Sequence, residues 1–287
     1  MPVGYIPMNK KSFGIYHVVF KVPPMPDIAI ILAGFAVGLI VGLTGVGGGS
    51  LMTPILIFFF GVKPYMAVGT DLLFAAVTKL GGTVQLARQK LVPWRVVGQL
   101  SAGSLPAALL TLLLLRQLGP ATAAVQSIMT NTLGVALLLT AAAMLYKAAR
   151  GKQLPRDLPP GQLELAAQAR HWSLPVLFGA VIGTLVTLTS VGAGAIGVSV
   201  LLLLFPLLPL PRIVAADIAY AVPLTLVAGL GHASLGSVDW PLLVKLLAGS
   251  LPGIWIGTRL MRHTPERLVR SALSVLLAYA GTKLIAL

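Results

Sequence analysis

Two glycine-rich stretches carry the residue types best suited to hold a small anion. The first, VGLTGVGGG at residues 41–49, is followed by Ser50, and the second, VTLTSVGAG, occupies residues 186–194. Glycine lets the backbone turn left-handed and brings amides close to a bound group, and amides at a helix start attract negative charge. We predict substrate binding at Gly45, Gly47, Gly48, Gly49, Ser50, Ser190, Gly192 and Gly194.

Close helix packing is the alternative role for such glycines, because small residues also let two helices approach each other. Gly34, Gly38 and Gly42, spaced four residues apart, fit that packing role. For the tighter clusters the spacing favours ligand binding. The hydroxyls of Thr187 and Thr189 also have two interpretations, since they either donate to an oxyanion or bond back to their own helix.

Charged residues lie inside the predicted apolar spans, where a charge is costly unless it faces a cavity or an opposite charge. Lys79, together with Thr70, completes the predicted substrate-binding set. Asp71 lies eight residues before Lys79, too far along a helix axis for a simple pair. Asp71 and Asp217 either carry coupled protons or cap the starts of their helices. We interpret His232 as a packing residue rather than a proton relay.

The elements that must position these residues occur twice in the chain. The glycine stretches lie 145 residues apart, and AGSLP at residues 102–106 returns unchanged at residues 248–252. Asp71 aligns with Asp217 in the same register. An ordered series of matches at spacings of 145 and 146 residues is the signature of internal duplication.

Composition indicates an integral membrane protein. The 287 residues are 57% hydrophobic and only 10% charged, with a mean hydropathy of +0.93, which leaves too little polar surface for a water-soluble globule. The net charge of +14 lies in short loops, as positive-inside orientation predicts, so nucleic-acid binding is not expected. The sequence lacks cysteine, metal-ligand spacings and nucleotide motifs. We expect no enzyme, no cofactor and no metal.

The apolar runs divide the chain into four parts. Residues 1–26 form an N-terminal interfacial segment, 27–146 a first transmembrane repeat, 147–172 a polar cytoplasmic linker and 173–287 a second repeat. Each repeat begins with two pieces too short to cross a bilayer, followed by three full spans. In the first repeat, Thr53 and Pro54 are expected to start a half-helix as its N-cap and first residue.

Equivalent loops of the two repeats have opposite charge bias. The loop at residues 88–95 has three basic residues and no acidic one, whereas Asp239 is the only charged residue of its counterpart at 234–241. Opposite bias is expected when equivalent loops lie on opposite sides of the membrane. The predicted fold is therefore an all-α integral membrane protein of two inverted-topology repeats, each a broken or re-entrant glycine-interrupted hairpin plus three transmembrane helices.

The pattern GxxxGxxxGLTGVGGGSxxxPxL at residues 34–56, followed by AVGTDL at 67–72, resembles the sulfite exporter TauE/SafE family. The resemblance implies a multi-pass protein of the bacterial cytoplasmic (inner) membrane that exports sulfite or a related organosulfur anion by alternating access. An anion channel and a non-transporting scaffold are the alternatives. The expected partners are a small anion and the lipid bilayer, without nucleic acid. The anion, its coupling and direction, the side of the N-terminus and the oligomeric state, a homo-oligomer included, stay open.

Overall fold

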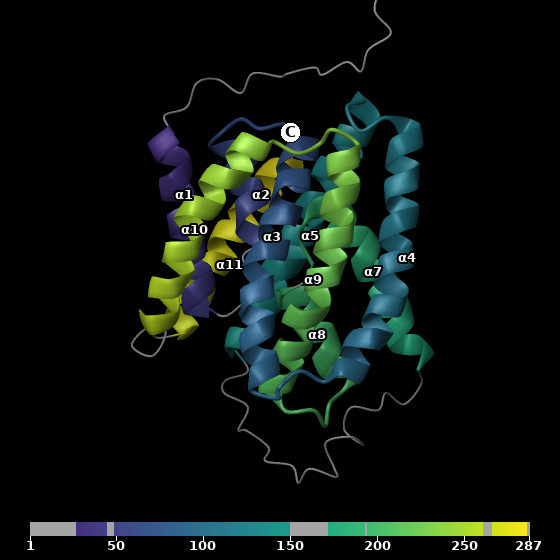
Figure 1. Ribbon diagram of the computed structural model, residues 1–287, viewed down its shortest axis with the longest axis vertical. Coiled ribbons are helices and arrows are strands. Elements are labelled where there is room, and N and C mark those ends of the chain that lie inside the picture. The colour runs from purple at the N-terminus through teal and green to yellow at the C-terminus, as the bar shows by residue number, and fades with distance from the viewer. Residues whose placement is uncertain (1–26, 45–48, 150–171, 193, 261–265, 286–287) are drawn as a thin grey trace, which may run out of the picture.

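The computed structural model describes residues 27–44, 49–149, 172–192, 194–260 and 266–285. The N-terminal segment, nearly all of the linker and Gly45, Gly47 and Gly48 lie outside the described residues. The described part forms ten helices and no strand (Figure 1), which are α1 (Asp27–Thr44), α2 (Gly49–Phe58), α3 (Pro64–Arg88), α4 (Trp94–Leu118), α5 (Ala123–Ala149), α7 (Ser173–Thr189), α8 (Ala195–Leu204), α9 (Leu210–Ser234), α10 (Trp240–Leu260) and α11 (Glu266–Ile285). The expectation of an all-α fold is confirmed.

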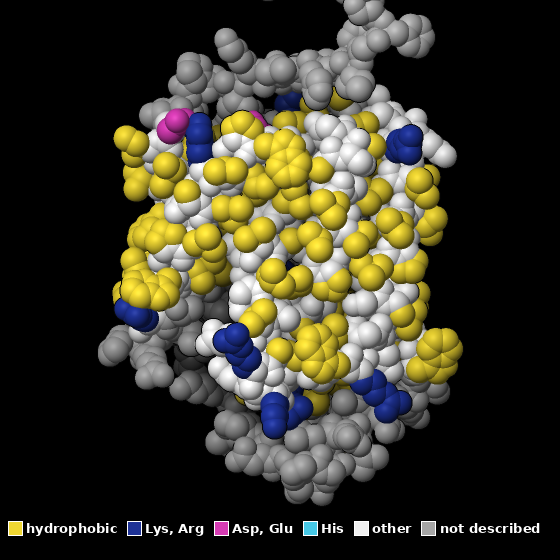
Figure 2. Space-filling view, in the orientation of Figure 1, with side chains coloured by type: hydrophobic (Ala, Val, Ile, Leu, Met, Phe, Trp, Pro, Cys, Tyr) yellow, Lys and Arg dark blue, Asp and Glu magenta, His cyan; other side chains and the backbone are white. Residues whose placement is uncertain are grey.

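The outer surface is apolar over most of its height. In the described residues four segments have the length and hydropathy of a membrane span, namely Trp94–Leu118, Ala123–Leu145, Leu210–Ser234 and Trp240–Gly257. Helix α3, expected to span, is not among them, and it carries Asp71, Lys79 and Arg88. Figure 2 shows apolar side chains across the middle of one face, with Lys and Arg near the two ends. This distribution fits a protein whose middle is surrounded by lipid.

The short helices α2 and α8 have ten residues each, which corresponds to about 15 Å, half of a bilayer core. Helix α2 begins at Gly49, so the expected start at Thr53 is wrong, and Pro54 lies inside the helix. Thr53 does not cap its own helix because its hydroxyl and its N–H both donate to Asp71. The chain is thus interrupted where the sequence predicted, but the first half-helix starts four residues earlier.

The first helix of each half packs against the fourth helix of the other half. A Cβ on Gly34 of α1 would overlap the carbonyl of Leu246 in α10, and one on Gly179 of α7 would overlap the carbonyl of Leu100 in α4. Gly38 meets Ser250 in the same manner. The packing role predicted for Gly34 and Gly38 is confirmed. The close contacts interlock the two halves of the chain.

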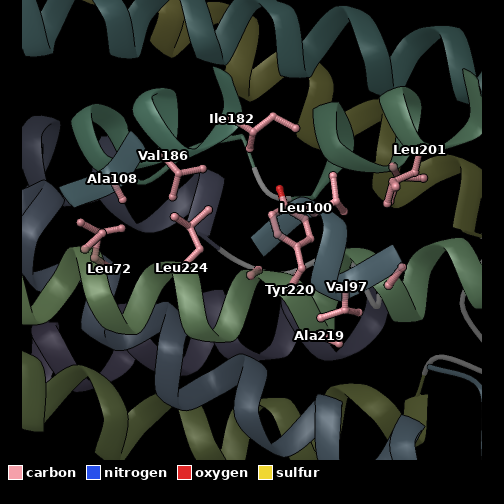
Figure 3. Close-up of a cluster of buried hydrophobic side chains, with 14 of the residues drawn as sticks. Leu72, Val97, Leu100, Ala108, Ile182, Val186, Leu201, Ala219, Tyr220 and Leu224 are labelled. Carbon is pink, nitrogen blue, oxygen red and sulfur yellow. The ribbon is translucent and has the colours of Figure 1, made fainter. Parts of the chain in front are cut away.

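Helices α3 and α9 lie side by side in the centre, with α2 against α3 and α8 against α9. In Figure 1, α3 runs from the upper end of the molecule to the lower end, and α9 runs the opposite way. A hydrophobic cluster around α9 includes Leu72, Val186 and Leu224 (Figure 3). This central pair carries the buried charges that the sequence singled out.

Candidate functional site

The first half of the site is a contact between Asp71 and the half-helix α2. Oδ2 of Asp71 accepts a hydrogen bond from the Thr53 hydroxyl at 2.5 Å and another from the Thr53 N–H at 3.2 Å. Both side chains are fully buried. Oδ1 of Asp71 has no hydrogen-bond partner among the described residues. One oxygen of the carboxyl is therefore held by α2, and the other remains available to a ligand.

The end of α7 brings Ser190 to the same carboxyl. Ser190 has a left-handed backbone, with φ of 60°, and its N–H donates to the Val186 carbonyl at 2.7 Å. Its side chain is 5% exposed, and its hydroxyl interacts with the Asp71 carboxyl without forming a hydrogen bond of normal geometry. The glycine stretch thus places a buried hydroxyl next to the acid of the first half.

In the second half, Asp217 lies against the half-helix α8. A Cβ on Gly197, in the first turn of α8, would overlap Oδ1 of Asp217. Gly192 and Gly194 have φ values of 135° and 137°, a region that favours glycine, and the Gly197 N–H donates to the Gly192 carbonyl at 3.0 Å. The sequence predicted such conformations for the first glycine stretch, and in the second stretch they shape the turn that leads into α8.

Lys79 links the two halves electrostatically. Its side chain is only 5% exposed, and its charge interacts with both carboxyl groups, more strongly with Asp217 than with Asp71. The expectation that Lys79 lies too far from Asp71 for a simple pair considered α3 alone, and the sequence did not reveal that α9 brings a second acid to the same lysine. Tyr220, one turn after Asp217, is fully buried, and its hydroxyl interacts electrostatically with the Asp217 carboxyl.

The interpretation that each aspartate caps the start of its own helix is wrong, because neither aspartate lies there. Asp71 and Asp217 are each the eighth residue of α3 and α9, which begin at Pro64 and Leu210. Their carboxyl groups instead meet the neighbouring half-helices, Asp71 at Thr53 in the second turn of α2 and Asp217 at Gly197 in the first turn of α8. Two equivalent acids therefore face two equivalent half-helices.

Thr70, predicted to bind substrate, has a partner within the protein. Its hydroxyl oxygen accepts a hydrogen bond of 3.0 Å from the N–H of Asp239. The Asp239 side chain in turn accepts one from the N–H of Leu242 in the first turn of α10. Thr70, the residue before Asp71, thus fixes the start of α10 relative to α3.

Two hydroxyls that the sequence left open bond back to their own helix. Thr187 donates to the Gly183 carbonyl at 2.7 Å, and Thr189 donates to the Leu185 carbonyl at 2.6 Å. His232 is fully buried, and its Nε2 lies 2.9 Å from the Thr187 carbonyl oxygen. These contacts support the packing interpretation of His232, and of the hydroxyls in this stretch it is that of Ser190 that interacts with Asp71.

Two residues of the site were missed by sequence reasoning. Thr53 was assigned to a helix cap, although a hydroxyl beside a proline in an apolar run also suits a partner on another helix. Tyr220 follows Asp217 by three residues and so shares its helical face, a signal that the sequence did contain. Figure 3 shows Tyr220 surrounded by apolar side chains, and its hydroxyl has no hydrogen-bond partner in the described residues.

A cavity of about 180 Å³ lies elsewhere, between α4, α5 and α7. Its lining is almost entirely apolar and includes Leu114, Leu118, Ile128 and Leu188. An apolar lining offers no compensation for a desolvated charge, so this cavity does not suit an anion. In the described residues no group of His, Cys, Asp and Glu could hold a metal ion.

Comparison with known proteins gives consistent matches over nearly the whole chain. Residues 30–284 match the model of the family described as sulfite exporter TauE/SafE. The chain is 37% identical to the probable membrane transporter protein YjnA of Bacillus subtilis (strain 168), over 90% of this chain and 100% of that protein. It is 27% identical to YdhB and 25% identical to YunE, two probable membrane transporter proteins of the same organism, over 89% and 91% of this chain and 99% and 98% of theirs. No solved structure matches.

Proposed function

This chain belongs to the sulfite exporter TauE/SafE family, and we propose that it exports sulfite or a related small organosulfur anion by alternating access. The family and the relatives are membrane transporters, so the chain is a multi-pass membrane transporter and not an enzyme. The location that we propose is the bacterial cytoplasmic membrane.

The observation that carries this proposal is the meeting of two half-helices with two buried acids around Lys79. An opened backbone and buried charges are expensive in lipid, and they survive where they serve an ion or a substrate. A half-helix start with its amides suits an anion. A scaffold would need none of these features, and both halves of the chain have them.

We propose that residues 27–146 and 173–287 are two inverted repeats joined by a cytoplasmic linker at 147–172. The opposite directions of α3 and α9 in Figure 1 support this, as does the exchange of equivalent contacts between α1 with α10 and α7 with α4. The loop between α3 and α4 lies at the lower end of the molecule in Figure 1, and Arg88, Lys90 and Arg95 lie in or beside it. We assign this end to the cytoplasm. The segment 1–26 is proposed to lie at the membrane interface.

Within the site we propose distinct roles for the polar residues. Lys79 attracts the anion, and Ser190 with the glycines of residues 192–194 lines its path. The glycines at 45–49 and Ser50 are proposed to line the equivalent path in the first half, across from the second near the bilayer midplane. Thr70 contributes by holding α10 in place. Asp71 and Asp217 carry protons that move with the anion.

Counterflow in proteoliposomes tests the function. Purified protein is reconstituted, loaded with unlabelled sulfite, and assayed for uptake of labelled sulfite against sulfate, chloride and taurine as competitors. A transporter accelerates labelled uptake when the same anion is present inside, and sulfite or an organosulfur anion should give the largest acceleration. Flux without such acceleration would favour the channel alternative, and no flux of any tested anion would favour the scaffold.

A further inference from the structure

We propose that the carboxylate of Asp71 occupies the anion site of the first half, so that it and the transported anion exclude each other. The inference rests on the proposed function, because it concerns the same site. In this view the N–H and the hydroxyl of Thr53 in α2 hold the Asp71 carboxylate until the substrate arrives. Substrate binding then requires that Asp71 leave these donors or take up a proton.

The donors around Asp71 are those that an oxyanion would use. A single carboxyl oxygen receives both the N–H and the hydroxyl of Thr53, and these groups belong to the half-helix that follows a glycine stretch. Charge-assisted bonds of this kind are among the stronger hydrogen bonds in proteins. A sulfite oxygen, like a carboxylate oxygen, carries partial negative charge and accepts hydrogen bonds, so the two ligands compete for one place.

Two further groups are arranged for a ligand that is larger than a carboxylate. The Ser190 hydroxyl and Oδ1 of Asp71 are both buried, and neither has a hydrogen-bond partner in the part of the chain that is described. Buried polar atoms are normally satisfied, so each unsatisfied one needs an explanation. A three-oxygen anion at the start of α2 would accept from Thr53 with one oxygen and from Ser190 with another.

The charges that face this place cannot accommodate both anions. Lys79 of α3 interacts with Asp71, and it interacts more strongly with Asp217 of α9, whose charge also reaches Tyr220. While Asp71 and Asp217 are both ionised, they share the Lys79 ammonium, which then leaves no positive charge for a third anion. Because like charges at a few ångströms repel strongly in a partly desolvated interior, the substrate and an ionised Asp71 do not share the site.

The second half has a residue of the same kind at the equivalent place. At the spacing of 146 residues that relates Asp71 to Asp217, Thr53 corresponds to Ser199, and both are the fifth residue of their half-helices. Asp217 lies against Gly197 and interacts with Lys79. The proposed competition is stated for Asp71, because its carboxyl receives both the N–H and the hydroxyl of Thr53.

Binding of labelled sulfite to the purified protein in detergent, at a pH at which sulfite is anionic, tests the inference. Asp71→Asn removes the competing charge, and its neutral amide oxygen is a weaker acceptor that a sulfite oxygen can displace from Thr53, so sulfite should bind about tenfold tighter or more. Asp27→Asn is the matched control, since Asp27 pairs with Lys245 far from the site and its removal should leave the affinity unchanged. Unchanged or weaker sulfite binding by a folded Asp71→Asn protein would overturn the proposal.

A second variant separates competition from a general effect of charge. Thr53→Val removes the hydroxyl that serves the carboxylate in the wild type and the anion in Asp71→Asn. Its effect on sulfite affinity should be small in the wild type and several-fold larger in the Asp71→Asn protein. Equal effects in both backgrounds would overturn the competition. Absence of sulfite binding and flux in the wild-type protein would instead contradict the proposed function.

Discussion

Asp71 and Asp217 occupy the same place in the two halves of the molecule, but different neighbours hold them. Asp71 receives two hydrogen bonds from Thr53 and has the Ser190 hydroxyl beside it. Asp217 lies against Gly197 and interacts with Lys79 more strongly than Asp71 does. The lysine of the first half is thus coupled more strongly to the acid of the other half than to the acid of its own helix.

The difference shows which features the duplicated architecture requires and which the two halves could change. The eighth position of the central helix, facing a half-helix, is common to both acids. The lysine is present in α3 alone, because its counterpart in α9 is Thr225. One lysine therefore serves both carboxyl groups, and the second half has none of its own at this position.

The largest effect is expected from Lys79→Gln, which removes the charge that both halves share. The anion should bind at least tenfold more weakly, since a buried positive charge is lost while the packing is nearly kept. Labelled sulfite binding measures this, with Lys245→Gln as the control at the surface ion pair. Unaltered affinity with normal expression would remove Lys79 from the anion site.

The crossing of α4 with α7 and the crossing of α10 with α1 are equivalent in the two halves. We expect a substitution at either crossing to lower stability by a similar amount. A Cβ at Gly103 would overlap the Val176 carbonyl, and one at Gly249 would overlap the Ile31 carbonyl. Each Gly→Ala change should lower the free energy of unfolding by about 1–3 kcal/mol. Thermal unfolding in detergent measures it, and Gly98→Ala, which meets open space in α4, serves as the control. Loss at only one crossing would contradict the equivalence.

The next effect concerns the pH dependence of transport. Asp71→Asn should flatten this dependence more than it lowers the maximal rate, because asparagine cannot take up or release the proton that the carboxyl carries. The measurement is sulfite efflux from proteoliposomes at several pH values with the membrane potential clamped. A parallel drop at every pH would assign Asp71 to holding α2 in place, and flux that follows potential alone would indicate a uniporter or a channel.

The sequence predicted the helices more accurately than their contacts. The span expected at residues 66–87 is α3 at 64–88, because hydropathy and the flanking Pro64 and Gln89 act locally. The two half-helices were predicted for the same reason. Thr53 was misassigned to a cap, since a cap and a contact with another helix both use one hydroxyl and one N–H.

The sequence by itself determined that this chain lies in a membrane, that its plan is repeated, and where glycine opens the backbone. Composition and spacing encode these properties directly. Only the tertiary structure decided that α1 crosses α10, that Thr53 binds Asp71 across 18 residues, and that Lys79 interacts with acids on two helices. Such contacts depend on how helices are rotated and placed against each other, and the hydropathy of a single helix contains no information about the residue it will face.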